Sequence, residues 1–179
     1  LVELLLEGEV NVALVGDLDE RPERIDDWTL FEERYVAVLA QSHELANLPA
    51  ISIDTLREAM ILERTYCDVA PKFQRLCFAD TMSEHPSHRS CHDLHLQHLA
   101  AAGFGIVLAP EHMPRLPSLK ALPIEGDPVW REVRLLAVQG RRYSPALDAF
   151  VKVARLRDWS LHAQSLRHQS HSNATNVSP

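Results

Sequence analysis

The stretch Leu99-Ala-Ala-Ala-Gly103-Phe-Gly105-Ile-Val-Leu-Ala-Pro110-Glu111 decides the fold of this 179-residue chain. Small residues lead to a first glycine, a second glycine follows, and a purely apolar run ends at a proline. This order predicts the end of a helix, a tight glycine turn and a buried strand that Pro110 stops. A helix that leads directly into a fully buried strand is the unit of parallel α/β sheets, so the predicted fold class is α/β.

The start of the chain repeats this pattern. Residues 1–7 predict a helix that ends at Gly8, and the apolar run 10–15 predicts a buried strand, after which Gly16 opens a loop. Because the chain starts inside a helix of this kind, we expect earlier strands to precede it in a longer protein.

A long strand and several shorter elements fill the rest of the chain. Residues 28–40 alternate with charge at first and are then apolar, which predicts a strand that passes from one lobe into another. Further helices are expected over 51–59, 69–78 and 90–103 and from Ser144-Pro145 onward. The helix over 90–103 is expected to start at a capping box, which Ser90 to Asp93 match. Further strands are expected over 60–62, 119–124 and 132–139. The polar, aromatic-free segment 160–179 predicts a disordered tail.

Composition narrows the class of protein. The formal net charge of -7 at pH 7 argues against a nucleic-acid-binding surface, which is normally basic. No apolar run approaches the ~20 residues that a membrane span needs, and the first residues lack the basic region of a signal peptide. Three cysteines do not form a disulfide framework. We therefore expect a soluble, cytoplasmic protein without a membrane partner.

Four segments, taken in order, resemble the C-terminal effector-binding domain of the LysR-type transcriptional regulators. They are Leu4-Leu-Leu-Glu-Gly-Glu-Val-Asn-Val-Ala-Leu-Val15, Leu30-Phe-Glu-Glu-Arg-Tyr-Val-Ala-Val38, Ala101-Ala-Gly-Phe-Gly-Ile-Val-Leu-Ala-Pro110 and Ser144-Pro-Ala-Leu-Asp-Ala-Phe150. The family's first motif usually reads Gly-x-x-Asp-x-Ala, and Asn11 stands here in place of the acid. The resemblance covers residue 1 to about residue 159.

The resemblance implies a two-lobed, periplasmic-binding-protein-like (type 2) domain in which lobe one is incomplete. Lobe one would hold 1–36 with 110–159 and lobe two 37–109, so that the glycine turn would lie where the chain leaves lobe two. A small-molecule effector would bind in the cleft between the lobes. The resemblance further implies a homodimer or tetramer that contacts DNA only through an N-terminal domain absent from this chain.

Parallel sheets bind ligands beyond the carboxyl ends of their strands, beside helix N-termini. This geometry predicts effector-binding residues in three places: Gly16, Arg64 with Thr65, and Ser90 with Cys91 and His92. Arg64 would suit an anionic effector, because its guanidinium group offers a planar fork of donors to a carboxylate. The plain alternatives are a solvated surface arginine at 64 and an ordinary helix cap at Ser90.

Cys67 and Cys77 suggest a second function, because peroxide-sensing members of the resembled family carry two cysteines in a comparable place. If the intervening residues are helical, however, the two Cα atoms lie ~15 Å apart, and a disulfide needs less than ~7 Å. Cys77 also falls on an apolar face, where a buried thiol is ordinary.

Histidines at 85, 88, 92, 95 and 98, together with Cys91, suggest a metal site at first sight. Steps of three residues drift around a helix, and the metalloprotease spacing is absent, so we expect no metal and no cofactor. No nucleophile elbow, phosphate loop or dinucleotide fingerprint is present, so we expect no catalytic residues and no enzyme. A transport-type solute-binding protein and a small metal-dependent hydrolase remain the alternatives from other classes.

Overall fold

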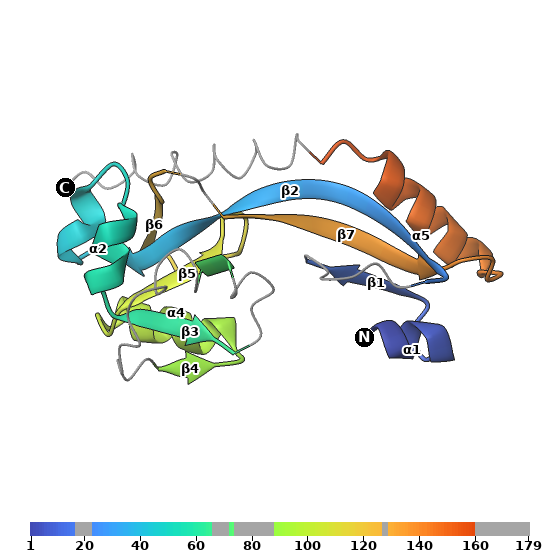
Figure 1. Cartoon of the computed structure of the whole chain (residues 1–179), viewed down its shortest axis with the longest axis horizontal. Helices are drawn as coiled ribbons and strands as arrows, with labels where there is room; N and C mark the ends of the chain where they lie inside the picture. The colour runs from blue at the N-terminus through green and yellow to red at the C-terminus, as the bar shows by residue number, and fades with distance from the viewer. Residues whose placement is uncertain (17–22, 66–71, 74–87, 127–128, 160–179) are drawn as a thin grey trace. The chain divides into compact units, whose positions relative to one another are not determined.

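The computed structural model describes residues 1–16, 23–65, 72–73, 88–126 and 129–159. Its contacts divide the chain into two compact units, unit 1 (Leu1–Glu32 with Glu132–Pro179) and unit 2 (Glu33–Arg131). Two strands, β2 (Ile25–Ala40) and β7 (Trp130–Val138), have residues in both units (Figure 1). The predicted long strand that passes from one lobe into another is therefore present as β2.

Unit 2 is built on a mixed sheet in the order β6-β2-β5-β3-β4. Its other strands are β3 (Ile61–Arg64), β4 (Arg89–Ser90), β5 (Ile106–Pro110) and β6 (Leu119–Pro123). Strand β2 is antiparallel to β5 and β6, whereas β3 is parallel to both β4 and β5. The carboxyl ends of β3, β4 and β5 therefore lie at one edge of the sheet.

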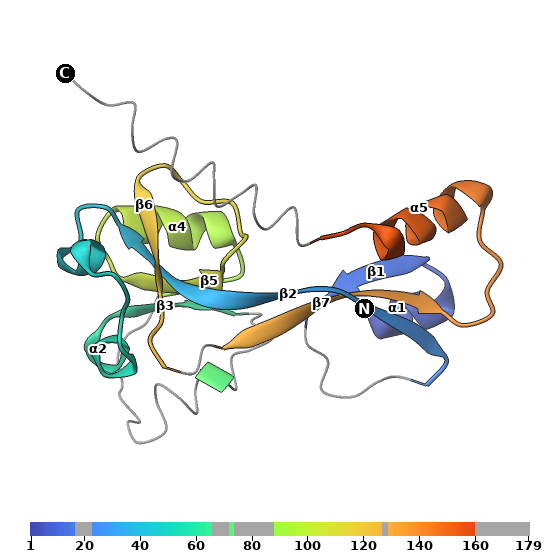
Figure 2. The ribbon, with the colours of Figure 1, turned by 90° about the horizontal axis from the view of Figure 1, so that it is seen from above.

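Both faces of this sheet are buried, because successive apolar residues of β2 and β5 point to opposite faces and pack in two separate clusters. Helix α4 (Asp93–Ala101) covers one face, where Leu96 and Ala100 pack against alternate residues of β2 and β5. Helix α2 (Ile53–Glu58) and the short 3-10 helix η1 (Glu44–Asn47) pack on the other face (Figure 2). Such two-sided burial explains why the strand after the glycine turn is apolar throughout.

Unit 1 contains α1 (Val2–Glu7), β1 (Val12–Val15) and α5 (Pro145–Leu156), and β1 is antiparallel to β7. Gly8 ends α1 at φ 86°, the left-handed conformation expected of a helix-terminating glycine. Ser144 caps α5 by accepting a hydrogen bond from the backbone N–H of Leu147. The helix ends predicted at both places are confirmed.

Residues 110–131 differ from the predicted lobe assignment, which placed them in lobe one. Strand β6 pairs with β2 over Val36–Ala40, and Ile51 forms a bridge with Ile124, so this segment packs with unit 2. The glycine turn at 103–105 therefore lies within unit 2 and is not the place where the chain leaves it. The predicted tail over 160–179 lies outside the described residues. None of the helices in the described part of the chain is long and apolar enough to span a membrane.

Candidate functional site

Five of the six predicted effector-binding residues meet at the carboxyl edge of β3 and β4. Arg64 and Ser90 are register partners in these parallel strands, and the backbone N–H of Thr65 donates to the Ser90 carbonyl oxygen at 3.0 Å. Cys91 and His92 follow at once and lead into α4. The sixth residue, Gly16, follows β1 and belongs to unit 1.

Arg64 is held by a carboxylate of the protein itself. Its Nη2 donates a hydrogen bond to Oδ2 of Asp93 at 3.2 Å, and its Nε lies 2.6 Å from the buried Oδ1 as an ion-pair contact without hydrogen-bond geometry. The Arg64 side chain is only 20% exposed. The plain alternative of a solvated surface arginine is therefore wrong, and the anion-binding fork of Arg64 is present but occupied.

Ser90 does not cap α4, and the predicted capping box is wrong. The helix begins at Asp93, and its N-cap residue is His92, which makes no side-chain cap hydrogen bond. The Ser90 Oγ instead accepts from the backbone N–H of His92 at 3.0 Å. The reason is that strand pairing with β3 fixes the Ser90 backbone, so the helix starts only at Asp93, three residues after the last residue of β4.

The cysteine and histidine predictions fall partly outside the described residues, as Cys67, Cys77 and His85 do. Cys91 is an exposed free thiol, and the His92 and His95 rings lie 5.0 Å apart between centroids. In the part of the chain that the structure describes, no group of three or more metal-ligating side chains comes together.

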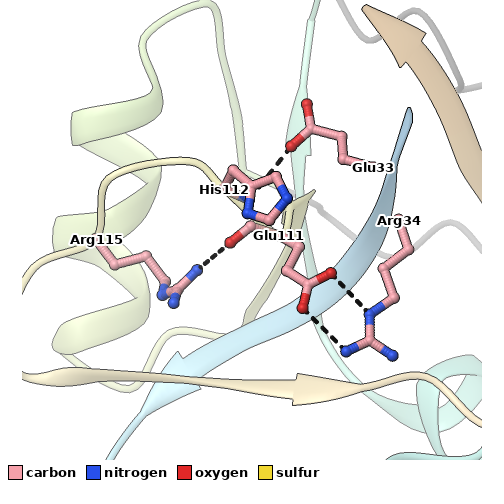
Figure 3. Close-up of polar contacts among 5 residues, drawn as sticks. All are labelled: Glu33, Arg34, Glu111, His112 and Arg115. Carbon is pink, nitrogen blue, oxygen red and sulfur yellow. Dashed lines mark hydrogen bonds and ion pairs between the residues drawn. The ribbon is translucent and has the colours of Figure 1, made fainter. Parts of the chain in front are cut away.

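Glu111 and its neighbours form a polar cluster at the carboxyl end of β5 that sequence reasoning missed (Figure 3). The guanidinium group of Arg34 donates to both oxygens of the Glu111 carboxylate, at 2.9 and 3.0 Å. Arg115 donates to the Glu111 carbonyl oxygen at 2.8 Å. Burial lowers the pKa of Arg115, and the nearby Glu111 carboxylate opposes that shift.

Glu33 is a buried carboxylate in the same cluster, with 3% of its surface exposed. Its Oε1 accepts from Nε of Arg131 at 2.8 Å, and its Oε2 accepts from the backbone N–H of His112 at 3.3 Å. The Arg131 guanidinium also lies 5.8 Å from the centre of the Tyr35 ring. Glu33 is the first residue of β2 that belongs to unit 2. It connects β2 to His112, two residues beyond the end of β5, and to Arg131, the last residue of unit 2.

A groove of about 410 Å³ lies elsewhere in unit 2, around the amino ends of β3 and β5. Its lining includes Glu44, Glu58, Met60 and Phe104. Because these residues lie at the opposite ends of the strands from Arg64 and Ser90, this groove is separate from the candidate site.

Comparison with known proteins identifies the family. The model of the LysR substrate binding domain matches residues 1–158. The reduced form of OxyR from N. meningitidis has a TM-score of 0.69 at 20% identity, with 86% of this chain and 74% of that chain covered. The C-terminal domain of a probable LysR family regulator from Rhodococcus sp. RHA1 has a TM-score of 0.71 at 21% identity, with 86% and 78% covered. The effector binding domain of QuiR in complex with shikimate has a TM-score of 0.68 at 21% identity, with 86% and 74% covered. No curated protein sequence matches this chain.

The fold and the family model therefore define a ligand-sensing domain of a transcriptional regulator. The chain belongs to the LysR substrate binding domain family. The predicted family and the predicted periplasmic-binding-protein-like fold class are both confirmed. This family consists of effector-binding domains of regulators, which are not enzymes.

Proposed function

We propose that this domain binds a small anionic effector at the carboxyl edge of β3, β4 and β5. The observation that carries the proposal is the parallel pairing of Arg64 with Ser90, which brings a guanidinium fork, two hydroxyl side chains and the first turn of α4 to one edge. Guanidinium, hydroxyl and helix N-terminal N–H groups are the donors that bind carboxylates in proteins. The solved regulatory domains of QuiR, in complex with shikimate, and of Synechocystis PCC6803 CcmR, in complex with 2-PG, support a small-molecule effector.

Binding would act by shifting a population of conformations. An effector that prefers one arrangement of the domain stabilises that arrangement, and this preference changes the geometry of a regulator that assembles from several copies. We therefore propose a homodimer or tetramer in the cytoplasm, whose contact with DNA is made by another domain. The acidic charge of this chain supports that division of labour.

The test is a titration of the isotope-labelled protein with a panel of small carboxylates that begins with shikimate, followed by NMR of the backbone amides. We expect the largest shifts at Thr65 and at residues 90–94. Arg64→Ala should weaken binding by tenfold or more, as the loss of a charge-assisted pair implies. Arg57→Ala is the control, because Arg57 also pairs with a helix first-turn aspartate, at 2.8 Å, but lies on α2. Shifts confined to other residues would overturn the assignment of the site, and unchanged affinity in Arg64→Ala would remove Arg64 from it.

A further inference from the structure

Asp93 occupies the Nε side of the Arg64 guanidinium group, the side that would otherwise face an anionic ligand at this edge. The Asp93 carboxylate faces Nε and Nη2 of Arg64, accepting a hydrogen bond from Nη2 and making an ion-pair contact with Nε. A second carboxylate cannot take the same pair of donors. A carboxylate effector that takes this side of Arg64 must therefore replace Asp93, and otherwise only the remaining N–H donors of Arg64 are open to it.

Asp93 is well placed to be replaced. Its side chain is 38% exposed, and its Oδ1 is buried without a hydrogen-bond partner, so the carboxylate gains hydration when it leaves Arg64. It is also the first residue of the nine-residue helix α4, where the positive end of the helix dipole stabilises a carboxylate with or without Arg64. Glu33, by contrast, is 3% exposed and has no access to water of this kind.

The carboxyl edge of β3 and β4 carries two arginines and two carboxylates, and displacement of Asp93 would change how they pair. Glu63 pairs with Arg89 at 2.6 Å, and Asp93 pairs with Arg64, so the four side chains sum to zero. Such an edge attracts a simple anion weakly. Arg64 presents an unpaired positive charge to a ligand only when Asp93 no longer faces it.

We propose that Asp93 is an internal competitor that the effector carboxylate displaces from Arg64. This inference rests on the proposed function of the edge. A ligand that offers only a carboxylate exchanges one such group for another and gains little. A ligand that also hydrogen-bonds to the hydroxyls of Ser90 or Thr65 gains contacts that Asp93 cannot make. Asp93 therefore makes the site selective for hydroxylated carboxylates over simple ones.

The test uses acetate, a carboxylate without further polar groups, as the probe in NMR titrations of four proteins. They are the unmodified chain, Asp93→Asn, the control Asp54→Asn and the double variant Asp93→Asn/Arg64→Ala. Asp54 is a matched control because it is also a first-turn aspartate paired with an arginine, at 2.8 Å. Asparagine keeps the shape of the side chain and removes its charge.

We expect Asp93→Asn to bind acetate at least fivefold more tightly than the unmodified chain, with shifts at the Arg64 Nε–H and at the Thr65 and Ser90 amides. The gain should be missing in Asp54→Asn and lost in the double variant. Equal acetate affinity in Asp93→Asn and the unmodified chain would overturn the proposal, as would a gain that survives Arg64→Ala. If the unmodified chain binds a panel carboxylate at this edge but Asp93→Asn gains nothing, the proposed function stands and the exchange alone fails.

Discussion

Gly105 is the residue of the glycine turn at which a side chain should do most harm. Its φ is 154°, a conformation that L residues rarely adopt, and a Cβ built there would overlap the Met60 carbonyl oxygen and lie 3.2 Å from the carbonyl carbon. That oxygen accepts the hydrogen bond from Ile106 N–H, at 2.8 Å, that starts the pairing of β3 with β5. Gly103 also has a positive φ, 83°, but a Cβ there meets no atom within 4 Å.

The pair of variants Gly105→Ala and Gly103→Ala therefore separates backbone strain from overlap. Each should lose about 1–2 kcal/mol for a positive φ. Gly105→Ala should lose a further ~1–3 kcal/mol, because the overlapped atom belongs to the backbone and cannot turn away. With a urea m-value of about 2 kcal/mol/M, the midpoint of Gly105→Ala should lie about 0.5–1.5 M below that of Gly103→Ala.

Urea unfolding followed by circular dichroism measures this difference directly. Gly103→Ala is the control, since it makes the same chemical change two residues away in the same turn. If the two midpoints agree within about 0.2 M, the close approach of Met60 to Gly105 does not limit stability and the reasoning is refuted.

Two further predictions concern a buried ion pair and the cysteines. Glu33→Gln should lower the free energy of unfolding by about 3 kcal/mol, because it leaves Arg131 facing a neutral group inside the protein. Asp148→Asn, which breaks an exposed pair with Lys152, should stay within about 0.5 kcal/mol in the same urea experiment, and equal losses would contradict the role of burial. For the cysteines, helical spacing between Cys67 and Cys77 predicts that all three thiols remain free after mild peroxide treatment; loss of two thiols in a thiol-counting assay would favour peroxide sensing instead.

Local patterns predicted most of the elements of the fold. The glycines at 8, 103 and 105, the capping serine at 144 and the apolar runs each determine structure within a few residues of themselves, and the structure has helix ends, a cap and strands at these places. The lobe boundary was harder to predict, because the placement of residues 110–131 depends on the pairing of β6 with β2, about 80 residues earlier in the chain. No local signal encodes such a pairing.

For the candidate site, too, local features were predicted from the sequence, whereas contacts between distant residues were not. The rule that ligands bind beyond the carboxyl ends of parallel strands needs only the strand ends, and the two residues it predicted, Arg64 and Ser90, do lie side by side in the structure. It could not find the carboxylates that hold the arginines, since Asp93 lies 29 residues from Arg64, Glu111 lies 77 from Arg34, and Glu33 lies 98 from Arg131. A charged stretch such as 32–34 indicates that partners are needed, but not which residues supply them.

The three carboxylates that pair with Arg131, Arg34 and Arg64 differ in how much of each side chain is exposed. The Glu33 side chain is 3% exposed, Glu111 is 16% and Asp93 is 38%. Removing a carboxylate from its arginine costs more as less water can reach it, so of these three pairs the Asp93 pair opens most readily and the Glu33 pair least readily. Because Arg64 also ends β3, the proposed exchangeable anion site coincides with the edge where parallel sheets bind their ligands. Two independent properties, burial and strand direction, thus favour Arg64 over Arg34 and Arg131 as the arginine of the proposed site.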